Sequence, residues 1–127
     1  MSKPWLSRKR REELRRYLDD PLRVAATIGS VAEKLLGNVE VFLFGSTAEG
    51  DATMASDIDV LVVSPNTPKS ASGRSRIAIA ILEKIGLDAP VEIHVATPEE
   101  LKWYKRFSKK MVQAYPGKST GASSQPP

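Results

Sequence analysis

The stretch that decides the fold is VEVFLFGSTAEGDATMASDIDVLVV, residues 39–63. It contains two runs of β-branched and aromatic residues, 39–44 and 58–63, separated by a polar segment. Short apolar runs of this kind, bounded by turn residues, are typical of buried β-strands. We therefore expect two neighbouring strands joined by a loop over residues 45–56, whose first residues start a helical turn.

The flanking sequence predicts four helices and a third strand. The predicted helices span residues 7–18, 21–36, 70–85 and 98–112, and the third strand spans 90–96. Asp20-Pro21 and Thr97-Pro98 each place a capping residue before a proline at the first helical position, and Glu100 completes a capping box. The resulting order, α-α-β-β-α-β-α, predicts an α/β or α+β fold with a mixed sheet of at least three strands flanked by helices.

Length and composition set the expected domain organisation. With 127 residues, 41% hydrophobic and 27% charged, the chain has the size and make-up of one globular domain. Residues 116–127 carry no large apolar side chain with which to build a core. We expect a basic N-terminal helix over 1–20, one folded domain over 21–113 and a disordered tail over 114–127.

Some classes of protein are excluded by what the sequence lacks. It has no cysteine, so neither a disulfide framework nor a thiolate metal site can form. It has no apolar run long enough for a transmembrane helix, and its first residues lack the apolar stretch of a secretory signal. We expect a cytoplasmic protein without a membrane partner.

The net charge of +4 raises the question of nucleic-acid binding. Basic residues crowd segments 3–16 and 102–110, and most carboxylates lie between them. This distribution suits a protein that handles phosphates, but it suits ordinary solvated helix faces equally well. No predicted strand interleaves aromatic and basic residues, as base-stacking surfaces do. Nucleic acid therefore ranks low among the expected partners, although it stays open.

Asp57 and Asp59 are the first candidate site residues. Alternate residues of a strand point to the same face, so the two carboxylates are expected to project together. Carboxylates held close together repel each other unless a cation lies between them, and Mg²⁺ prefers such oxygen ligands. The competing interpretation, common for an isolated Asp-x-Asp, is that Asp57 caps a turn and Asp59 faces solvent.

Gly45 and Ser46 are candidate phosphate-binding residues. A glycine permits close approach of the backbone, and N–H groups at a helix start bind anions. The Ser46 hydroxyl adds a further donor. Alone, Gly45 is simply the turn that ends a strand, but its position before Asp57 and Asp59 suggests a phosphate cradle beside a metal site.

Glu92 and His94 lie on the third predicted strand, two residues apart and so on one face. If this strand lies beside the Asp-x-Asp strand, Glu92 can share a metal or accept a proton from an attacking hydroxyl. The alternative for Glu92 is a solvent-exposed position at the sheet edge. His94, the only histidine, is more simply interpreted as a structural side chain near the site.

Gly45-Ser46, ten intervening residues and Asp57-Ile58-Asp59 together resemble the signature of DNA polymerase β-like nucleotidyltransferases. Within these, the chain is most similar to the minimal nucleotidyltransferases, and residues 92–101 also resemble their third-strand region. The resemblance covers about residues 22–112. It is specific because the spacing, the residue types and the predicted strands agree.

The resemblance implies the polymerase β-like nucleotidyltransferase fold and a set of roles. Gly45 and Ser46 would bind the β- and γ-phosphates of ATP or another nucleoside triphosphate. Asp57 and Asp59 would ligate two Mg²⁺ ions, with Glu92 as the third carboxylate in place of the more usual aspartate. A nucleoside monophosphate, most simply AMP, would pass to an acceptor hydroxyl by a two-metal mechanism.

The acceptor is not specified by the sequence, and three functions stay open. Minimal nucleotidyltransferases are often antitoxins paired with a small helical HEPN protein, which would be a partner here; a homodimer is the other way to supply an acceptor surface. A small molecule or an RNA end is the second possibility. The third is a non-catalytic binding module that retains the fold.

Overall fold

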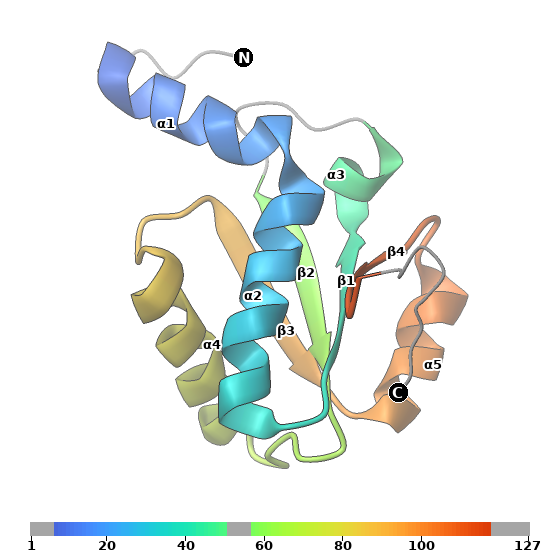
Figure 1. Ribbon diagram of the computed structural model, residues 1–127. Coiled ribbons are helices and arrows are strands. Elements are labelled where there is room, and N and C mark those ends of the chain that lie inside the picture. Colours follow the sequence, from blue (N-terminus) through green and yellow to red (C-terminus); the bar gives the residue numbers. More distant parts are fainter. Residues whose placement is uncertain (1–6, 51–56, 118–127) are drawn as a thin grey trace.

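The computed structural model describes residues 7–50 and 57–117. The elements in chain order are α1 (Arg8–Asp19), α2 (Pro21–Leu36), β1 (Glu40–Phe44), α3 (Gly45–Glu49), β2 (Ile58–Val63), α4 (Ala71–Ile85), β3 (Val91–Ala96), α5 (Pro98–Phe107) and β4 (Val112–Tyr115). Figure 1 shows them as a sheet with helices on both faces. The predicted α+β fold with a mixed, helix-flanked sheet is confirmed.

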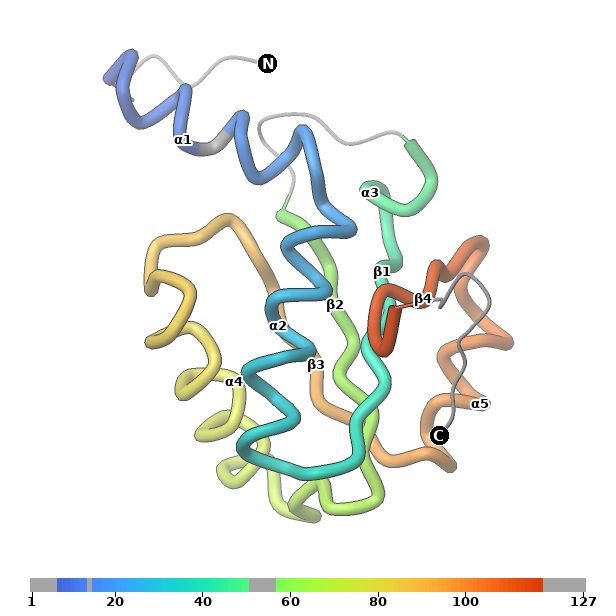
Figure 2. The backbone as a smooth tube through the Cα atoms, in the orientation of Figure 1, coloured from blue at the N-terminus to red at the C-terminus, as the bar shows by residue number. Residues whose placement is uncertain are grey.

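The sheet has the order β3-β2-β1-β4. β1 is antiparallel to both of its neighbours, β2 and β4, whereas β2 and β3 are parallel. The tube in Figure 2 follows β1 and β2 side by side at the centre. In this register Asp59, near the start of β2, lies between Phe44 at the end of β1 and Glu92 on β3.

The alternation of side chains along the strands divides the core between the two faces. Helices α2 and α4 cover one face, where Ile28 and Ile81 pack against Val60 and its neighbours. The other face is covered by α5, whose Leu101 packs in a smaller cluster with Leu61. Asp59 lies two residues from Leu61 and therefore on the α5 face. Asp59 thus lies on this face beside Phe44, at the edge of the smaller cluster.

The capping residues predicted from the sequence form the expected contacts. The Asp20 side chain accepts a hydrogen bond from the N–H of Arg23, with Pro21 following at the first helical position. Thr97 and Glu100 form a reciprocal capping box at the start of α5. Because each cap satisfies an N–H group that the helix leaves free, these helix starts were predictable from short sequence patterns.

The last predicted helix was wrong at its end. It was expected to reach residue 112, but α5 stops at Phe107, and Ser108 adopts an extended backbone conformation. A fourth strand, β4, follows instead and pairs with the free edge of β1. Of its four residues only Ala114 is buried, so the strand depends on this pairing and has no periodicity from which it could be predicted.

The predicted tail, 114–127, began too early for the same reason. Ala114 is buried and Tyr115 belongs to β4, so the folded domain extends beyond residue 113. The Tyr115 side chain packs on the backbone of Gly29, and its hydroxyl donates a hydrogen bond to Glu33. Residues 118–127 lie outside the described part of the chain.

Two further predictions concern segments at the edge of the described residues. The expected basic helix over 1–20 corresponds to α1, and its first six residues are not described. The loop predicted over 45–56 begins with the expected helical turn, α3, and residues 51–56 are not described. Among the helices of the described part, none is both long and apolar enough to cross a membrane.

Candidate functional site

Asp59 and Glu92 lie directly opposite each other on the parallel strands β2 and β3. His94, two residues further along β3, reaches both: its Nε2 lies 3.8 Å from Oδ1 of Asp59 and 3.7 Å from Oε2 of Glu92. The side chains of Asp59 and His94 are largely covered, whereas Glu92 is 60% exposed. The structure therefore brings together three of the residues singled out in the sequence.

Gly45 faces this cluster from the end of β1. A Cβ atom at position 45 would stand 2.3 Å from Oδ2 of Asp59, and the backbone φ of Gly45 is +73°. A side chain there would both collide with the carboxylate and strain the backbone. Glycine therefore suits this close approach, and the structure places Gly45 beside Asp59 as the sequence predicted.

The carboxylate of Asp59 experiences an unfavourable local environment. Desolvation by burial raises its pKa above the ordinary value, the neighbouring charges of Glu92 and Asp57 raise it further, and His94 acts in the opposite sense. The carboxylates of Asp59 and Glu92, at paired register positions, repel each other when both are ionised. A cation bound between them would relieve this repulsion.

Ser46 follows Gly45 in the first turn of α3 and is partly buried. Phe44 occupies the N-cap position of α3, and no side chain of the described residues caps this helix. The first N–H groups of the helix consequently lack a side-chain acceptor at the point where Gly45 meets Asp59. The hydroxyl of Thr47 is also buried, with no hydrogen-bond partner among the described residues. These donors suit an anionic ligand.

Asp57 lies just before β2 and is exposed. It is close enough to Asp59 to raise the pKa of that carboxyl, but it is not part of the compact three-residue cluster. The prediction that Asp57 and Asp59 share metal ions is therefore neither confirmed nor contradicted by this arrangement.

The donor set of the cluster fits a divalent cation. One ligand atom from each of Asp59, Glu92 and His94 lies within 4.8 Å of the others. Carboxylates are the ligands that Mg²⁺ and Mn²⁺ prefer, and an imidazole also suits Zn²⁺. The residues present thus match a site for at least one such ion.

Aromatic side chains line the same face and were not singled out in the sequence. The ring of Phe44 lies edge-on to His94 with 5.2 Å between centroids, and Tyr104 of α5 lies 5.8 Å from Phe44 and 6.4 Å from His94. The period-two pattern places Phe44 on the face of β1 that points away from α2. Tyr104 lies in a distant segment of the sequence, so only the packing of α5 on the sheet reveals its position beside Phe44 and His94.

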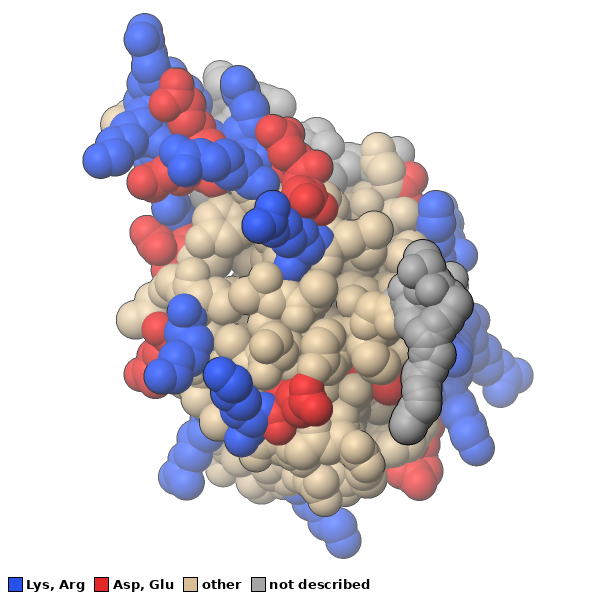
Figure 3. Space-filling view, in the orientation of Figure 1, with Lys and Arg blue, Asp and Glu red and all other residues tan. Residues whose placement is uncertain are grey.

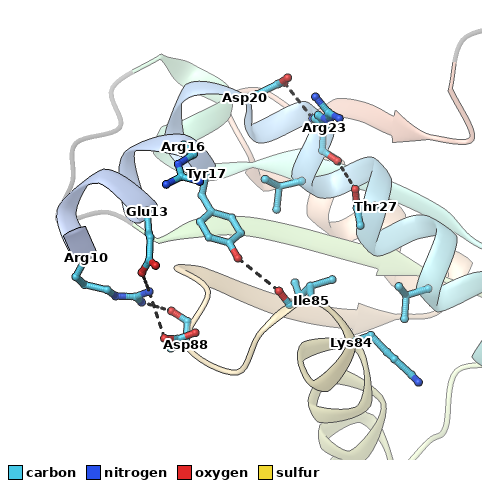
Figure 4. Close-up of a pocket in the computed structure, with 12 residues that line it drawn as sticks. Arg10, Glu13, Arg16, Tyr17, Asp20, Arg23, Thr27, Lys84, Ile85 and Asp88 are labelled. Carbon is cyan, nitrogen blue, oxygen red and sulfur yellow. Dashed lines mark hydrogen bonds and ion pairs between the residues drawn. The ribbon is translucent and has the colours of Figure 1, made fainter.

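A cavity of about 870 Å³ lies elsewhere, between α1, α2 and α4 (Figure 4). Arg10 closes one end through ion pairs with Glu13 and Asp88, and the Tyr17 hydroxyl donates a hydrogen bond to the carbonyl of Ile85. None of the candidate site residues lines it. The cavity therefore does not contribute to the carboxylate cluster.

Comparison with known proteins gives a consistent result. The family model described as nucleotidyltransferase domain matches residues 24–114. A crystal structure of a presumptive nucleotidyltransferase is 33% identical, covers 68% of this chain and 91% of its own, and has a TM-score of 0.55. A second presumptive nucleotidyltransferase, from Sulfolobus solfataricus, is 25% identical, covers 77% and 82%, and has a TM-score of 0.59. A comparison with curated proteins found no match.

Proposed function

Since the chain belongs to the nucleotidyltransferase domain family, we propose that it transfers a nucleoside monophosphate, AMP from ATP, to an acceptor hydroxyl. General nucleotidyl transfer follows from the family. That the transferred group is AMP, that two metal ions take part and that the acceptor is a hydroxyl are further proposals, beyond what the family establishes.

The observation that carries the proposal is the contact between Gly45 and Asp59. Gly45 lies next to the Asp59 carboxylate at the start of α3, which has no side-chain cap. This arrangement supports the proposal that backbone N–H groups bind an anion beside a carboxylate that binds a cation. A nucleoside triphosphate with its bound metal carries both kinds of charge. Such a substrate would occupy both sites at once.

In the proposed roles, Gly45 and Ser46 hold the β- and γ-phosphates. Asp59 and Glu92 hold the cation, and either carboxylate can accept the proton of the attacking hydroxyl. His94 contacts both carboxylates and keeps them in place. The repulsion that raises the pKa of Asp59 makes this pair receptive to a cation.

We propose Mg²⁺ as the cofactor, with two ions expected. Asp59 and Glu92 would hold one ion, and Asp57 together with Asp59 would hold the other. When bound, such ions stabilise the attacking and leaving oxygens of an in-line displacement. The exposed position of Asp57 leaves it accessible to an ion that arrives with the nucleotide.

A small helical protein of the HEPN type is the proposed partner, with this chain as its antitoxin, and a homodimer is the alternative assembly. Co-purification of the chain with the product of a neighbouring gene, followed by light scattering, would distinguish a heterocomplex from a homodimer. Recovery of the chain only as a monomer would contradict both assemblies.

The transfer reaction itself is tested by incubation with ATP labelled at the α-phosphate, Mg²⁺ and a cell extract as the source of acceptors. We expect label to become attached to an acceptor and pyrophosphate to be released. The Asp59→Asn/Glu92→Gln double variant should do neither, whereas Glu83→Gln, on an exposed position of α4, should match the wild type. Transfer by the double variant at the wild-type rate would contradict the proposed site.

A further inference from the structure

Strand β3 forms one edge of the sheet, and no strand of residues 7–50 or 57–117 pairs with its outer side. The carbonyls of Pro90 and Ala96 accept hydrogen bonds from β2 and from the residue that follows it, so the even-numbered residues of β3 direct their backbone groups toward β2. The odd-numbered residues direct theirs away from the sheet: Val91, Ile93 and Val95. An open strand edge of this kind can pair with another chain.

The backbone groups left free on this edge are self-complementary. Arg74 donates a hydrogen bond to the Val95 carbonyl. The N–H of Val91 donates to the carbonyl of Ala89. Within the described residues, two donors and two acceptors then have no partner: the N–H groups of Ile93 and Val95 and the carbonyls of Val91 and Ile93. An antiparallel second copy of the strand, centred on Ile93, would satisfy all four.

The side chains match in the same register. Glu92 of one copy would lie opposite His94 of the second copy, in a non-hydrogen-bonded pair, where side chains approach most closely. Glu92 is 60% exposed and is thus available for this contact. An imidazole N–H can donate to a carboxylate, and such complementary pairs stabilise antiparallel strands. Each copy would therefore contribute a side chain to the candidate site of the other.

The flank of α4 above this edge faces away from the rest of the molecule. Helix α4 packs on β3 and beside α2, whereas α2 lies over β1 and β4. Figure 1 shows the same order, with α4 as the outermost helix on that face of the sheet. The flank of α4 that faces away from α2 consequently lies over the free edge of β3.

This flank exposes apolar surface. Ile81 is buried in the core, whereas Ile79, about 160° around the helix, is 51% exposed. Leu82 lies on the same flank as Ile79 and opposite Lys84, which lines the cavity shared with α1 and α2. In Figure 3 most of the surface over α2 and α4 is uncharged, whereas Lys and Arg gather over α1. A helix that is apolar on more than its core side has a second surface suited to packing.

A second exposed apolar side chain flanks the edge on the other face of the sheet. Trp103 of α5 is 59% exposed and lines a cavity of about 470 Å³ together with Arg74, which bonds to the edge of β3. Aromatic side chains are enriched in protein interfaces. Ile79 and Trp103 thus flank one strand edge from opposite faces of the sheet.

We propose that two copies of the chain associate through β3, antiparallel and centred on Ile93, into one continuous sheet. The twofold match of the backbone groups, and of Glu92 with His94, favours a second copy over an unrelated strand as the occupant. The inference deepens the proposed function, in which a homodimer is one of two assemblies. The statement that each copy completes the site of the other rests on that function.

The first experiment measures the dimer dissociation constant by sedimentation velocity over a range of concentrations. We expect the wild type to dimerise. Ile93→Pro should raise the dissociation constant about 10-fold or more, because it removes one hydrogen bond from each copy. The lost N–H points away from β2, and proline is tolerated at such edge positions. The matched control, Ile93→Val, keeps the N–H and should stay dimeric.

The second experiment tests the flank of α4. Ile79→Lys should weaken the dimer about 10-fold or more, because it places like charges near each other in the two copies. Leu35→Lys, which changes a similarly exposed apolar side chain on α2, should dimerise as the wild type does. Melting curves will show that both variants are folded, as we expect from the exposure of the replaced side chains.

The third experiment determines the register with introduced cysteines, since the chain has none of its own. Glu92→Cys chains and His94→Cys chains, mixed and oxidised, should form a disulfide between the two kinds of chain. Neither kind should cross-link alone, because each thiol would face a position of the other kind. Cross-linking of Glu92→Cys chains with one another would show a different register and overturn the inference.

Failure of this inference and failure of the proposed function are distinguishable. Asp59→Asn should abolish nucleotidyl transfer and leave the dimer intact. A wild-type dimer that Ile93→Pro dissociates, but that transfers no nucleotide, would contradict the proposed function and leave the interface. A wild type that stays monomeric or associates only with a different protein would overturn the inference whether or not transfer occurs, and so would a dimer that neither Ile93→Pro nor Ile79→Lys weakens.

Discussion

Gly45 lies against Asp59 so closely that a methyl group on Gly45 would stand 2.3 Å from the carboxylate oxygen Oδ2. Gly45 begins α3 directly after β1, whereas Asp59 lies on β2, and the antiparallel pairing of β1 and β2 brings the two residues together across a segment of polar sequence. Their contact would join the backbone that we propose to bind phosphate to the carboxylate that we propose to bind the cation. The proposed function depends on this relationship.

Substitution of Gly45 tests the contact, with Gly50 as a matched control. Both glycines have positive φ, +73° and +83°, but a Cβ at position 50 would meet no atom of residues 7–50 or 57–117 within 4 Å. Gly50→Ala should therefore cost only the backbone strain, about 1–2 kcal/mol of unfolding free energy. Gly45→Ala should cost more and should lower nucleotidyl transfer by about 100-fold, because it displaces Asp59.

Urea unfolding and the transfer assay measure the two effects. Equal losses of stability and of activity in Gly45→Ala and Gly50→Ala would contradict the account, since both variants share the strain and only one has the collision.

The raised pKa of Asp59 predicts how stability depends on pH in the absence of divalent ions. A carboxyl whose folded-state pKa lies above its unfolded-state pKa stabilises the fold least when it is ionised. Its contribution to the unfolding free energy therefore falls as the pH rises through the folded-state pKa. Asp59→Asn removes the ionised form and should raise the melting temperature at pH 7 in a chelator. The difference should vanish below the unfolded pKa, about pH 4.

Melting curves of the wild type and Asp59→Asn across pH 3 to 8 provide the test. A variant that is less stable than the wild type at pH 7 without metal would argue against repulsion between Asp59 and Glu92.

Glu100 should contribute stability with the opposite pH dependence. Its pKa is lowered by the hydrogen bond from the Thr97 backbone and by Arg74, so its contribution is present above the unfolded pKa and is lost as pH falls through the folded value. Glu100→Gln should destabilise the protein at pH 7 by less than about 1 kcal/mol, because the ion pair is partly exposed. The difference in stability between the variant and the wild type should shrink as the pH falls below the unfolded-state pKa of Glu100.

The control for this prediction is Glu83→Gln, which changes an exposed carboxylate on α4 and should have no effect at either pH. A Glu100→Gln variant whose destabilisation persists unchanged at pH 3 would show that shape rather than charge is responsible.

Tyr115 should stabilise the fold from the last strand. Its ring packs on Gly29 of α2 and its hydroxyl donates to Glu33. Tyr115→Ala should lower the unfolding free energy by about 2–3 kcal/mol, toward the lower end expected for loss of a packed aromatic side chain. Trp103→Ala, at an exposed position, should change it by less than about 0.5 kcal/mol.

Urea denaturation midpoints decide this comparison. Similar midpoints for Tyr115→Ala and the wild type would mean that β4 contributes little to the folded state, contrary to its packing on α2.

Local patterns in the sequence were sufficient to predict most of the helices and strands. The caps at Asp20 and Thr97 and the apolar runs of β1 and β2 depend on residues close together in the chain, so helix starts and central strands were predictable. β4 depends on the edge of β1, which lies about 70 residues earlier, and its few residues carry no comparable local pattern.

The candidate site was predictable to a similar extent. Gly45, Asp59 and Glu92 were placed together because strand pairing and spacing constrain them. His94 was assigned only to the vicinity of the site, since a single histidine carries no pattern, and its contacts with both carboxylates depend on side-chain geometry. Tyr104 was not recognised, because it reaches the site only through the packing of α5 on the sheet.

The most direct test of the central claim uses the single histidine of the chain as a probe. His94 lies within 4 Å of the two carboxylates proposed to hold the cation. In proton NMR spectra of the untagged protein, Mn²⁺ with ATP should broaden the His94 imidazole signals at substoichiometric metal, because carboxylates bind Mn²⁺ as they do Mg²⁺. In Asp59→Asn/Glu92→Gln these signals should stay sharp. Equal broadening in both proteins, or sharp His94 signals in the wild type with saturating Mn²⁺ and ATP, would contradict a nucleotide–metal site at Gly45, Asp59 and Glu92.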